Sequence, residues 1–240
     1  MRERSTRLRN GGIVADDGID LDWNPDHFDP GFWQRRGAAV GEAAGGRGAV
    51  RFVETPFGEW AFRHYRRGGL VGRFFSDHYV WQGADRTRSV REWRLLKRLF
   101  EQGLPVPKPI AAIYIRRAAS YTADLVTRRI PGARPLSCHL AEAALPESAW
   151  RRLGACVRRF HEAGVCHADL TAHNLLLDHA GQPWLLDFDR GRIRAPGTWS
   201  TSNLDRLLRS LNKISMEDAA IQFAAANWES FHDGYRQTSA

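Results

Sequence analysis

The chain has 240 residues and a formal net charge of +8 at pH 7, which is enough length for one large domain or two small lobes with a buried core. No stretch approaches the roughly 18 consecutive apolar residues of a membrane-spanning helix, so a soluble or peripheral protein is expected. The charge is compatible with nucleic acid, an anionic membrane or a phosphorylated substrate and does not choose among them. Three cysteines without zinc-ligand spacing predict buried free thiols, at Cys138, Cys156 and Cys166.

Residues 1–40 are predicted to form an N-terminal arm. The first ten residues, MRERSTRLRN, are basic like the start of a signal peptide, but the following GGIVADDGIDLDWN is too polar for an export segment. We therefore expect a protein that stays in the cytoplasm. The arm lacks sustained periodicity, but DWNPDHFDPGFW is aromatic enough to pack on the lobe that follows.

Residues 41–130 are predicted to form an N-terminal lobe. It opens with a glycine-rich turn at residues 41–48, and apolar residues recur at helical spacing from Arg88 to Gln102 until Gly103 ends the run. The apolar positions of this helix are Val90, Trp93, Leu96 and Phe100. Extended segments rich in β-branched and aromatic residues are expected at 49–55, 59–67, 104–115 and 122–130.

Residues 131–240 are predicted to form a C-terminal lobe, with the turn pair Pro131–Gly132 at the joint. Its first helix is marked by apolar residues at helical spacing, and two more helical patterns lie around residues 204–211 and 216–235. The apolar positions of the first helix are Trp150, Leu153, Val157 and Phe160. Short strands are expected at residues 165–166, 175–177 and 184–186.

The stretch CHADLTAHNLLLDHAGQPWLLDFDRGR carries the most chemical information. It contains the form His-x-Asp-Leu-x-x-x-Asn and then Asp-Phe after a hydrophobic strand, the spacings of a kinase catalytic loop and metal loop. Asp169 would position and deprotonate an acceptor hydroxyl, and His167 would brace the loop by hydrogen bonding. Asn174 and Asp187 supply the oxygen ligands that Mg²⁺ prefers. The alternative is that Asp169 and Asn174 only cap turns, which does not account for Asp187 after the strand.

Phosphate-binding groups are expected in the N-terminal lobe. Gly46 and Gly48 of the glycine-rich turn would let the backbone approach the phosphates of ATP, although the spacing departs from the usual kinase pattern. Arg63 stands where a kinase strand carries lysine, and Glu92 on the following helix could pair with it. The alternatives are an exposed strand charge for Arg63 and a solvated helix face for Glu92. None of the chain's three lysines lies on this strand.

With HADLTAHNLLLD, PWLLDFDRGR, RHYRRGGLVGRF and TRRIPGARPL together, the chain resembles the bacterial 3-deoxy-D-manno-octulosonic acid (Kdo) kinases over nearly its whole length. The resemblance implies an α+β, bilobal, protein-kinase-like fold: an antiparallel sheet lobe with one main helix, then a reduced, mostly helical lobe. It also implies phosphorylation of the 4-hydroxyl of a Kdo residue on lipid A precursor, with ATP and Mg²⁺, by a peripheral enzyme on the cytoplasmic side of the inner membrane. The catalytic aspartate of the family maps to Asp169.

Two features agree with a small anionic acceptor. Only about fifty residues follow Asp187 and no Ala-Pro-Glu motif appears, so the platform on which protein kinases dock peptides is largely missing. An arginine set could receive a carboxylated sugar, lipid phosphates or an anionic leaflet, although single surface charges often do nothing specific. Its members are Arg63, Arg66, Arg67, Arg73, Arg190, Arg192 and Arg194.

Three other readings of the sequence stay open. The first is a kinase of the same fold with another acceptor, such as a heptose or an antibiotic. The second is a catalytically dead nucleotide-binding scaffold, suggested by the missing strand lysine. The third is a nucleic-acid-binding module that uses the positive charge, but no basic-aromatic recognition motif of a known kind is present. We expect no nucleic-acid partner and infer no protein partner.

Overall fold

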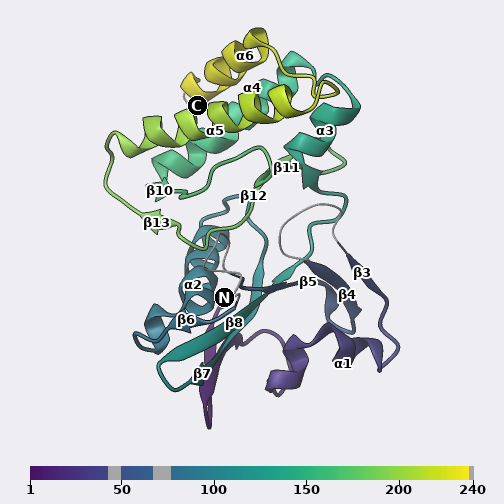
Figure 1. Ribbon diagram of the computed structural model, residues 1–240, viewed down its shortest axis with the longest axis vertical. Coiled ribbons are helices and arrows are strands. Elements are labelled where there is room, and N and C mark those ends of the chain that lie inside the picture. Colours follow the sequence, from purple (N-terminus) through teal and green to yellow (C-terminus); the bar gives the residue numbers. More distant parts are fainter. Residues whose placement is uncertain (43–49, 67–76, 238–240) are drawn as a thin grey trace. The chain divides into compact units, whose positions relative to one another are not determined.

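The computed structural model describes residues 1–42, 50–66 and 77–237. Gly46, Gly48, Arg67 and Arg73 lie outside the described residues. The chain divides into two compact units, the first made of residues 1–101 and 107–129 and the second of residues 102–106 and 130–240. Figure 1 shows the elements of each unit.

The first unit is built on an antiparallel sheet, which has eight strands among the described residues. The strand order is β1-β2-β7-β8-β5-β4-β3, and β6 pairs with β8. The neighbours along this path pair antiparallel, as the sequence predicts for a lobe made of hairpins. The strands are β1 Glu3–Leu8, β2 Gly11–Asp16, β3 Val40–Glu42, β4 Arg51–Thr55, β5 Gly58–His64, β6 Tyr79–Val80, β7 Pro109–Arg117 and β8 Ser120–Arg128.

Helix α2 (Arg88–Glu101) packs against β7 and β8. The helix predicted from Arg88 to Gln102 is present, and three of its four apolar positions are buried, whereas Phe100 is 39% exposed. Leu99, three residues after Leu96, is fully buried in its place. Residues three apart lie on the same helix face, so the buried stripe continues through Leu99 and turns Phe100 outward.

The N-terminal aromatic segment packs against the opposite face of the sheet. Residues alternate between faces along a strand, so Trp60 and Phe62 of β5 project away from the side of Arg63, which contacts α2. Trp23 stacks on Trp60 with ring centroids 5.6 Å apart, and Trp33 meets the same ring edge-on at 5.5 Å. The predicted aromatic packing is therefore present, and it includes the 3-10 helix η1 (Pro25–Phe28) and helix α1 (Pro30–Gln34).

Residues 3–16 form the hairpin β1–β2, where no periodicity predicts a strand. The reason lies in the burial of the two strands. Five of the six residues of β1 are polar or charged, and β1 is an edge strand, whereas five successive residues of β2 are buried, so β2 lacks the alternation of a half-exposed strand. The buried carboxylate of Asp16 at the end of β2 pairs with Lys108 Nζ at 2.6 Å.

The second unit is mostly helical. Its helices are α3 Leu136–Glu142, α4 Glu147–Glu162, α5 Trp199–Glu217 and α6 Ala225–Arg236. Small sheets accompany them, and those formed by the described residues are β10–β13 and β12-β11-β9. Their strands are β9 Arg134–Pro135, β10 Val165–Cys166, β11 Leu175–Leu177, β12 Pro183–Leu185 and β13 Arg192–Ile193. The antiparallel sheet followed by a helical unit confirms the predicted α+β fold class.

Helices α4 and α6 cross at two glycines. A Cβ added to Gly154 would lie 2.0 Å from the carbonyl oxygen of Phe231, and one added to Gly234 would lie 2.0 Å from that of Arg151. Any side chain at either position would therefore push the two helices apart. The predicted helical pattern over 216–235 is wrong in one respect, because residues 218–224 between α5 and α6 are not helical.

The remaining predictions concern membrane spans and cysteines. Within the described parts of the chain, every helix is too short or too polar to cross a membrane. All three cysteines are free, as expected, but only Cys156 is buried, since Cys138 and Cys166 are partly exposed. Burial raises the pKa of the Cys156 thiol to about 12.

Candidate active site

The loop that follows β10 brings the predicted residues of the second unit into one hydrogen-bonded network. The backbone N–H of Asp169 donates to His167 Nδ1 at 3.1 Å, and the Asn174 side-chain amide donates to the Asp169 carbonyl at 2.8 Å. The backbone N–H of Leu186 donates to the Asn174 carbonyl at 2.9 Å. His167 Nε2 lies 2.9 Å from the Leu186 carbonyl. Asp187 comes directly after Leu186, so the motif residues are joined through their backbones.

Both ring nitrogens of His167 are occupied by this network. A carbonyl oxygen only accepts, so Nε2 carries the proton and Nδ1 accepts from Asp169. Burial lowers the pKa of His167, and the Leu186 carbonyl and nearby Asp187 oppose that shift. The neutral ring therefore has no nitrogen left to take a proton from an acceptor. The geometry favours the bracing role that the sequence suggested for His167.

Asn203, on α5, holds the same loop and was missed by the sequence reasoning. Its Oδ1 accepts from the His167 backbone N–H at 3.0 Å, and its Nδ2 donates to the His167 carbonyl at 2.9 Å. Asn203 is 6% exposed, so its amide is fixed inside the unit. Its distance of 36 residues from His167 explains why no local motif signals it.

Arg206, one turn after Asn203 on α5, is a second residue that the sequence reasoning missed. Its Nη1 lies 3.4 Å from Asp169 Oδ1. The side chain of Asp169 is 60% exposed and that of Arg206 47% exposed. The proposed catalytic carboxylate is therefore open to solvent and has a cation beside it.

The chemistry of Asn174 and Asp187 fits a magnesium ion. Donation by the Asn174 Nδ2 to Asp169 fixes the amide so that its Oδ1 points elsewhere and can serve as a ligand. Asp187 is exposed and has φ of 62°, a left-handed conformation that is uncommon for residues other than glycine. No cluster of three or more His, Cys, Asp or Glu ligands occurs among the described residues. Mg²⁺ in kinases needs only one or two carboxylates, an amide oxygen, phosphates and water.

In the first unit, Arg63 of β5 and Glu92 of α2 form an ion pair, through Arg63 Nη2 and Glu92 Oε2. Glu92 is 2% exposed, so it is not a solvated helix face. Tyr65 completes the group, since its hydroxyl donates to Glu92 Oε2 at 2.6 Å and accepts from Arg63 Nη2 at 3.0 Å. The guanidinium also lies over the Tyr65 ring, 4.7 Å from its centroid. The surroundings of this strand position thus accommodate arginine, where the kinase motif carries lysine.

We expect Arg63→Lys to lower kcat/KM about tenfold or more, because one ammonium cannot reproduce the fork and the ring contact. Arg63→Ala should lower kcat/KM further, since it removes the cation that pairs with the buried Glu92 carboxylate. Steady-state kinetics with varied ATP measures both effects. The exposed Arg51→Lys on β4 is the matched control, and an Arg63→Lys variant as active as wild type would refute the geometric requirement.

Protonation of His161, a partly buried histidine, should destabilise the second unit in acid. His161 of α4 hydrogen-bonds Tyr235 at 2.8 Å, and burial lowers its pKa to about 4. The unfolded chain binds a proton at the ordinary value near 6.5, so the free energy of unfolding should fall as pH drops from about 6.5 to 4. The expected loss is on the order of 2 kcal/mol. Urea unfolding at several pH values measures it, and His161→Gln should flatten the profile. An unchanged slope would contradict the assignment.

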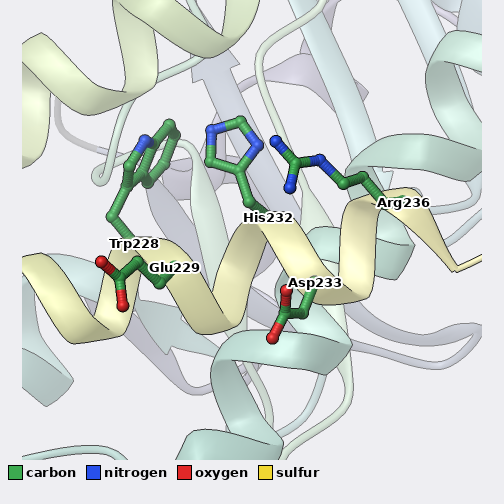
Figure 2. A pocket seen from close by; sticks show the side chains of 5 residues that line it. All are labelled: Trp228, Glu229, His232, Asp233 and Arg236. Atoms are coloured by element: carbon green, nitrogen blue, oxygen red, sulfur yellow. The ribbon is translucent and has the colours of Figure 1, made fainter.

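The other described arginines of the predicted set are divided between the two units. Arg66 is exposed in the first unit, and Arg190, Arg192 and Arg194 are exposed in the second, around β13. A separate hollow of about 350 Å³ lies on α6, where Trp228, His232 and Arg236 stand along one side of the helix (Figure 2). None of the predicted site residues lines this hollow, so it has no part in the candidate site.

Taken together, the catalytic-loop network and the strand–helix ion pair define a phosphotransferase of the protein-kinase type. The chain belongs to the lipopolysaccharide kinase (Kdo/WaaP) family, whose model matches residues 31–235. Two relatives from Stenotrophomonas maltophilia, both named 3-deoxy-D-manno-octulosonic acid kinase, are similar to it. The one from strain R551-3 is 49% identical over 80% of this chain and 76% of its own, and the one from strain K279a is 48% identical over 82% and 80%. A relative of the same name from Xylella fastidiosa strain 9a5c is 48% identical over 79% of this chain and 76% of its own. The predicted family is confirmed.

Proposed function

We propose that this chain transfers the γ-phosphoryl group of ATP to the 4-hydroxyl of a Kdo residue on lipid A precursor, in lipopolysaccharide core biosynthesis. The observation that carries the proposal is the network that joins Asp169, Asn174 and the residue before Asp187. Family membership and relatives named for Kdo support the acceptor.

The proposed roles follow from the chemistry of phosphoryl transfer, which needs positioning and charge neutralisation more than covalent help. Asp169 orients the acceptor hydroxyl and takes its proton, while His167 and Asn203 hold the loop in place. Asn174 and Asp187 would hold Mg²⁺, which neutralises charge on the phosphate oxygens when bound. In the first unit, Arg63 would bind a nucleotide phosphate, with Glu92 and Tyr65 fixing its direction. Gly46 and Gly48 remain proposed phosphate contacts outside the described residues.

The position of Arg206 supports a sugar acid, and not a neutral sugar, as the acceptor. Kdo carries a carboxylate, whereas a heptose does not, and a guanidinium binds a carboxylate through two parallel hydrogen bonds. Arg206 lies beside Asp169, where the acceptor hydroxyl must sit. We assign to Arg206 the binding of the acceptor carboxylate. When the acceptor binds, this contact would replace the contact between Arg206 and Asp169.

The assignment of Arg206 predicts a change in KM more than in kcat. Arg206→Gln should raise the KM for a Kdo acceptor about tenfold, since it removes one charge-assisted contact. Arg209→Gln, an exposed change on the same helix, is the control. An Arg206→Gln enzyme with unchanged KM would remove the carboxylate-binding role.

An acceptor panel tests the proposed reaction. The purified chain is incubated with ATP, Mg²⁺ and one acceptor: a Kdo-bearing lipid A precursor, its 4-deoxy analogue, or a heptose-bearing core saccharide. Transfer to the first acceptor alone is expected. Transfer to the 4-deoxy analogue would show that another hydroxyl is phosphorylated. Transfer to heptose but not to Kdo would refute Kdo as the acceptor sugar.

We place the enzyme on the cytoplasmic side of the inner membrane as a peripheral protein. The net charge of +8 supports this placement, because each basic residue near an anionic leaflet contributes about 1 kcal/mol of attraction. The acceptor would be the lipid-anchored substrate in that leaflet. Vesicle binding that does not depend on anionic lipid would contradict the electrostatic part of this placement.

A further inference from the structure

A hollow of about 510 Å³ in the first unit lies where the β1–β2 turn meets the β7–β8 turn, far along the sequence from any proposed catalytic residue. Four of its lining residues are arginines and two are large aromatics, and none of them is acidic. We call this surface the hairpin patch. Its charged and aromatic members are Arg7, Arg9, Trp81, Tyr114, Arg116 and Arg117.

The strand register builds one side of the hairpin patch. Arg7 of β1 is opposite Gly12 of β2, which is opposite Tyr114 of β7, so the three form a row across the sheet. A Cβ on Gly12 would lie 2.8 Å from the Tyr114 hydroxyl. The missing side chain therefore lets the tyrosine ring lie over the glycine, toward the strand that carries Arg7.

Trp81 builds the other side. Its ring centroid lies 5.4 Å from that of Tyr114, and the Arg116 guanidinium is 5.1 Å from its centroid. The backbone N–H of Arg116 donates to the Asn10 carbonyl at 2.8 Å, which joins the two turns. Leu8 and Ala118 also line the hollow. The patch thus combines positive charge with an aromatic and aliphatic surface.

Asp85, the carboxylate that acts on Tyr114 from outside the lining, is in an ion pair with an arginine that does not belong to the hairpin patch. Glu3 and Asp85 both pair with Arg94, at 2.8 Å and 2.7 Å. Asp85 and Arg7 act on Tyr114 in opposite directions, and burial dominates in raising the pKa of its phenol. The arginines of the patch are therefore not offset by carboxylates within it.

We propose that the hairpin patch is the surface that docks this enzyme on an anionic lipid bilayer. Tryptophan and tyrosine favour the headgroup level of a membrane, and arginines bind lipid phosphates through paired hydrogen bonds. Gly11 of β2 is opposite Ile115 of β7, so the turns of the two adjoining hairpins lie at the same end of their strands. The inference rests on the proposed function, because it assigns the membrane contact of a kinase whose acceptor is lipid-anchored.

The experiment measures co-sedimentation of the full chain with phosphatidylcholine vesicles, with and without phosphatidylglycerol. Arg9→Gln with Arg117→Gln removes two exposed patch charges, and Arg209→Gln with Arg236→Gln removes two exposed charges of the second unit. Each arginine near an anionic surface contributes roughly fivefold, so the patch variant should bind anionic vesicles about 20-fold more weakly. The control variant should bind like wild type. Both should melt at the wild-type temperature.

Equally weakened binding of the two variants to anionic vesicles would overturn the proposal that the hairpin patch docks on the membrane. The overall positive charge of the protein would then explain binding. Failure of the wild type to bind anionic vesicles would overturn the proposal as well, as would release of the protein by inorganic phosphate alone. Transfer to a soluble Kdo-bearing saccharide, assayed in parallel, should be unchanged in the patch variant. If no protein phosphorylates that saccharide while the vesicle pattern holds, the proposed function fails and the docking surface stands.

Discussion

Asp169→Ala should lower kcat by about three powers of ten or more while leaving the fold intact. The expected loss follows from removing the group that orients the acceptor hydroxyl and accepts its proton, an effect typically worth 10²–10⁴-fold. The side chain is 60% exposed, so its removal leaves no cavity. Single-turnover transfer from labelled ATP to a Kdo acceptor measures the change.

Asp205→Ala is the matched control for Asp169→Ala. It removes an exposed carboxylate from α5, next to Arg206 in sequence, and should keep the wild-type rate. Asp169→Asn keeps the shape of the side chain but cannot take the proton, so it should be nearly as slow as the alanine variant. A rate within tenfold of wild type in either Asp169 variant would refute the assigned role.

Asp187→Ala should abolish turnover by a different route, through loss of the bound metal. Removal of the carboxylate leaves Asn174 as the remaining predicted metal ligand in the second unit, so the Mg²⁺ concentration for half-maximal activity should rise well above the wild-type value. The rate at saturating Mg²⁺ should still be lower by about three powers of ten. Titration of activity with Mg²⁺ separates this variant from Asp169→Ala, whose half-maximal concentration should stay unchanged.

A second variant at Asp187 separates the loss of metal binding from misfolding. The backbone at Asp187 has φ of 62°, which asparagine tolerates better than alanine. Asp187→Asn should therefore fold as wild type and still require more Mg²⁺, since an amide oxygen is a weaker ligand than a carboxylate. An unchanged Mg²⁺ requirement in both variants would show that Asp187 does not hold the metal.

The proximity of Asp169 and Asn174 could be predicted because their motif has a fixed local spacing. Asp169 and Asn174 lie five residues apart in one loop, and their hydrogen bond requires only that loop to fold. The Arg63–Glu92 pair could also be anticipated, since a strand and the next helix of a kinase lobe bring those positions together. These groups could be predicted from the sequence because each depends on few contacts between distant parts of the chain.

Asn203 and Arg206 were not predictable for the opposite reason. Each acts on the catalytic loop from 36 or 37 residues away, on a helix whose polar positions look like ordinary surface residues. Strand β2 was missed because burial on both faces removes the alternation that identifies a strand, and β1 was missed because it is a mostly polar edge strand. The break between the last two helices was predicted before residue 216, but it lies at residues 218–224. Each of these features depends on packing between distant parts of the chain, which the local sequence pattern does not show.

The central claim is that the chain moves phosphate from ATP to Kdo by means of Asp169. Its most direct test is mass analysis of a Kdo-bearing lipid A precursor after incubation with ATP, Mg²⁺ and either wild type or Asp169→Ala. We predict that wild type adds one phosphate group, located on Kdo by fragmentation, and that the variant adds none in the same time. A wild-type product without phosphate on Kdo, or equal phosphorylation by the variant, would contradict the claim.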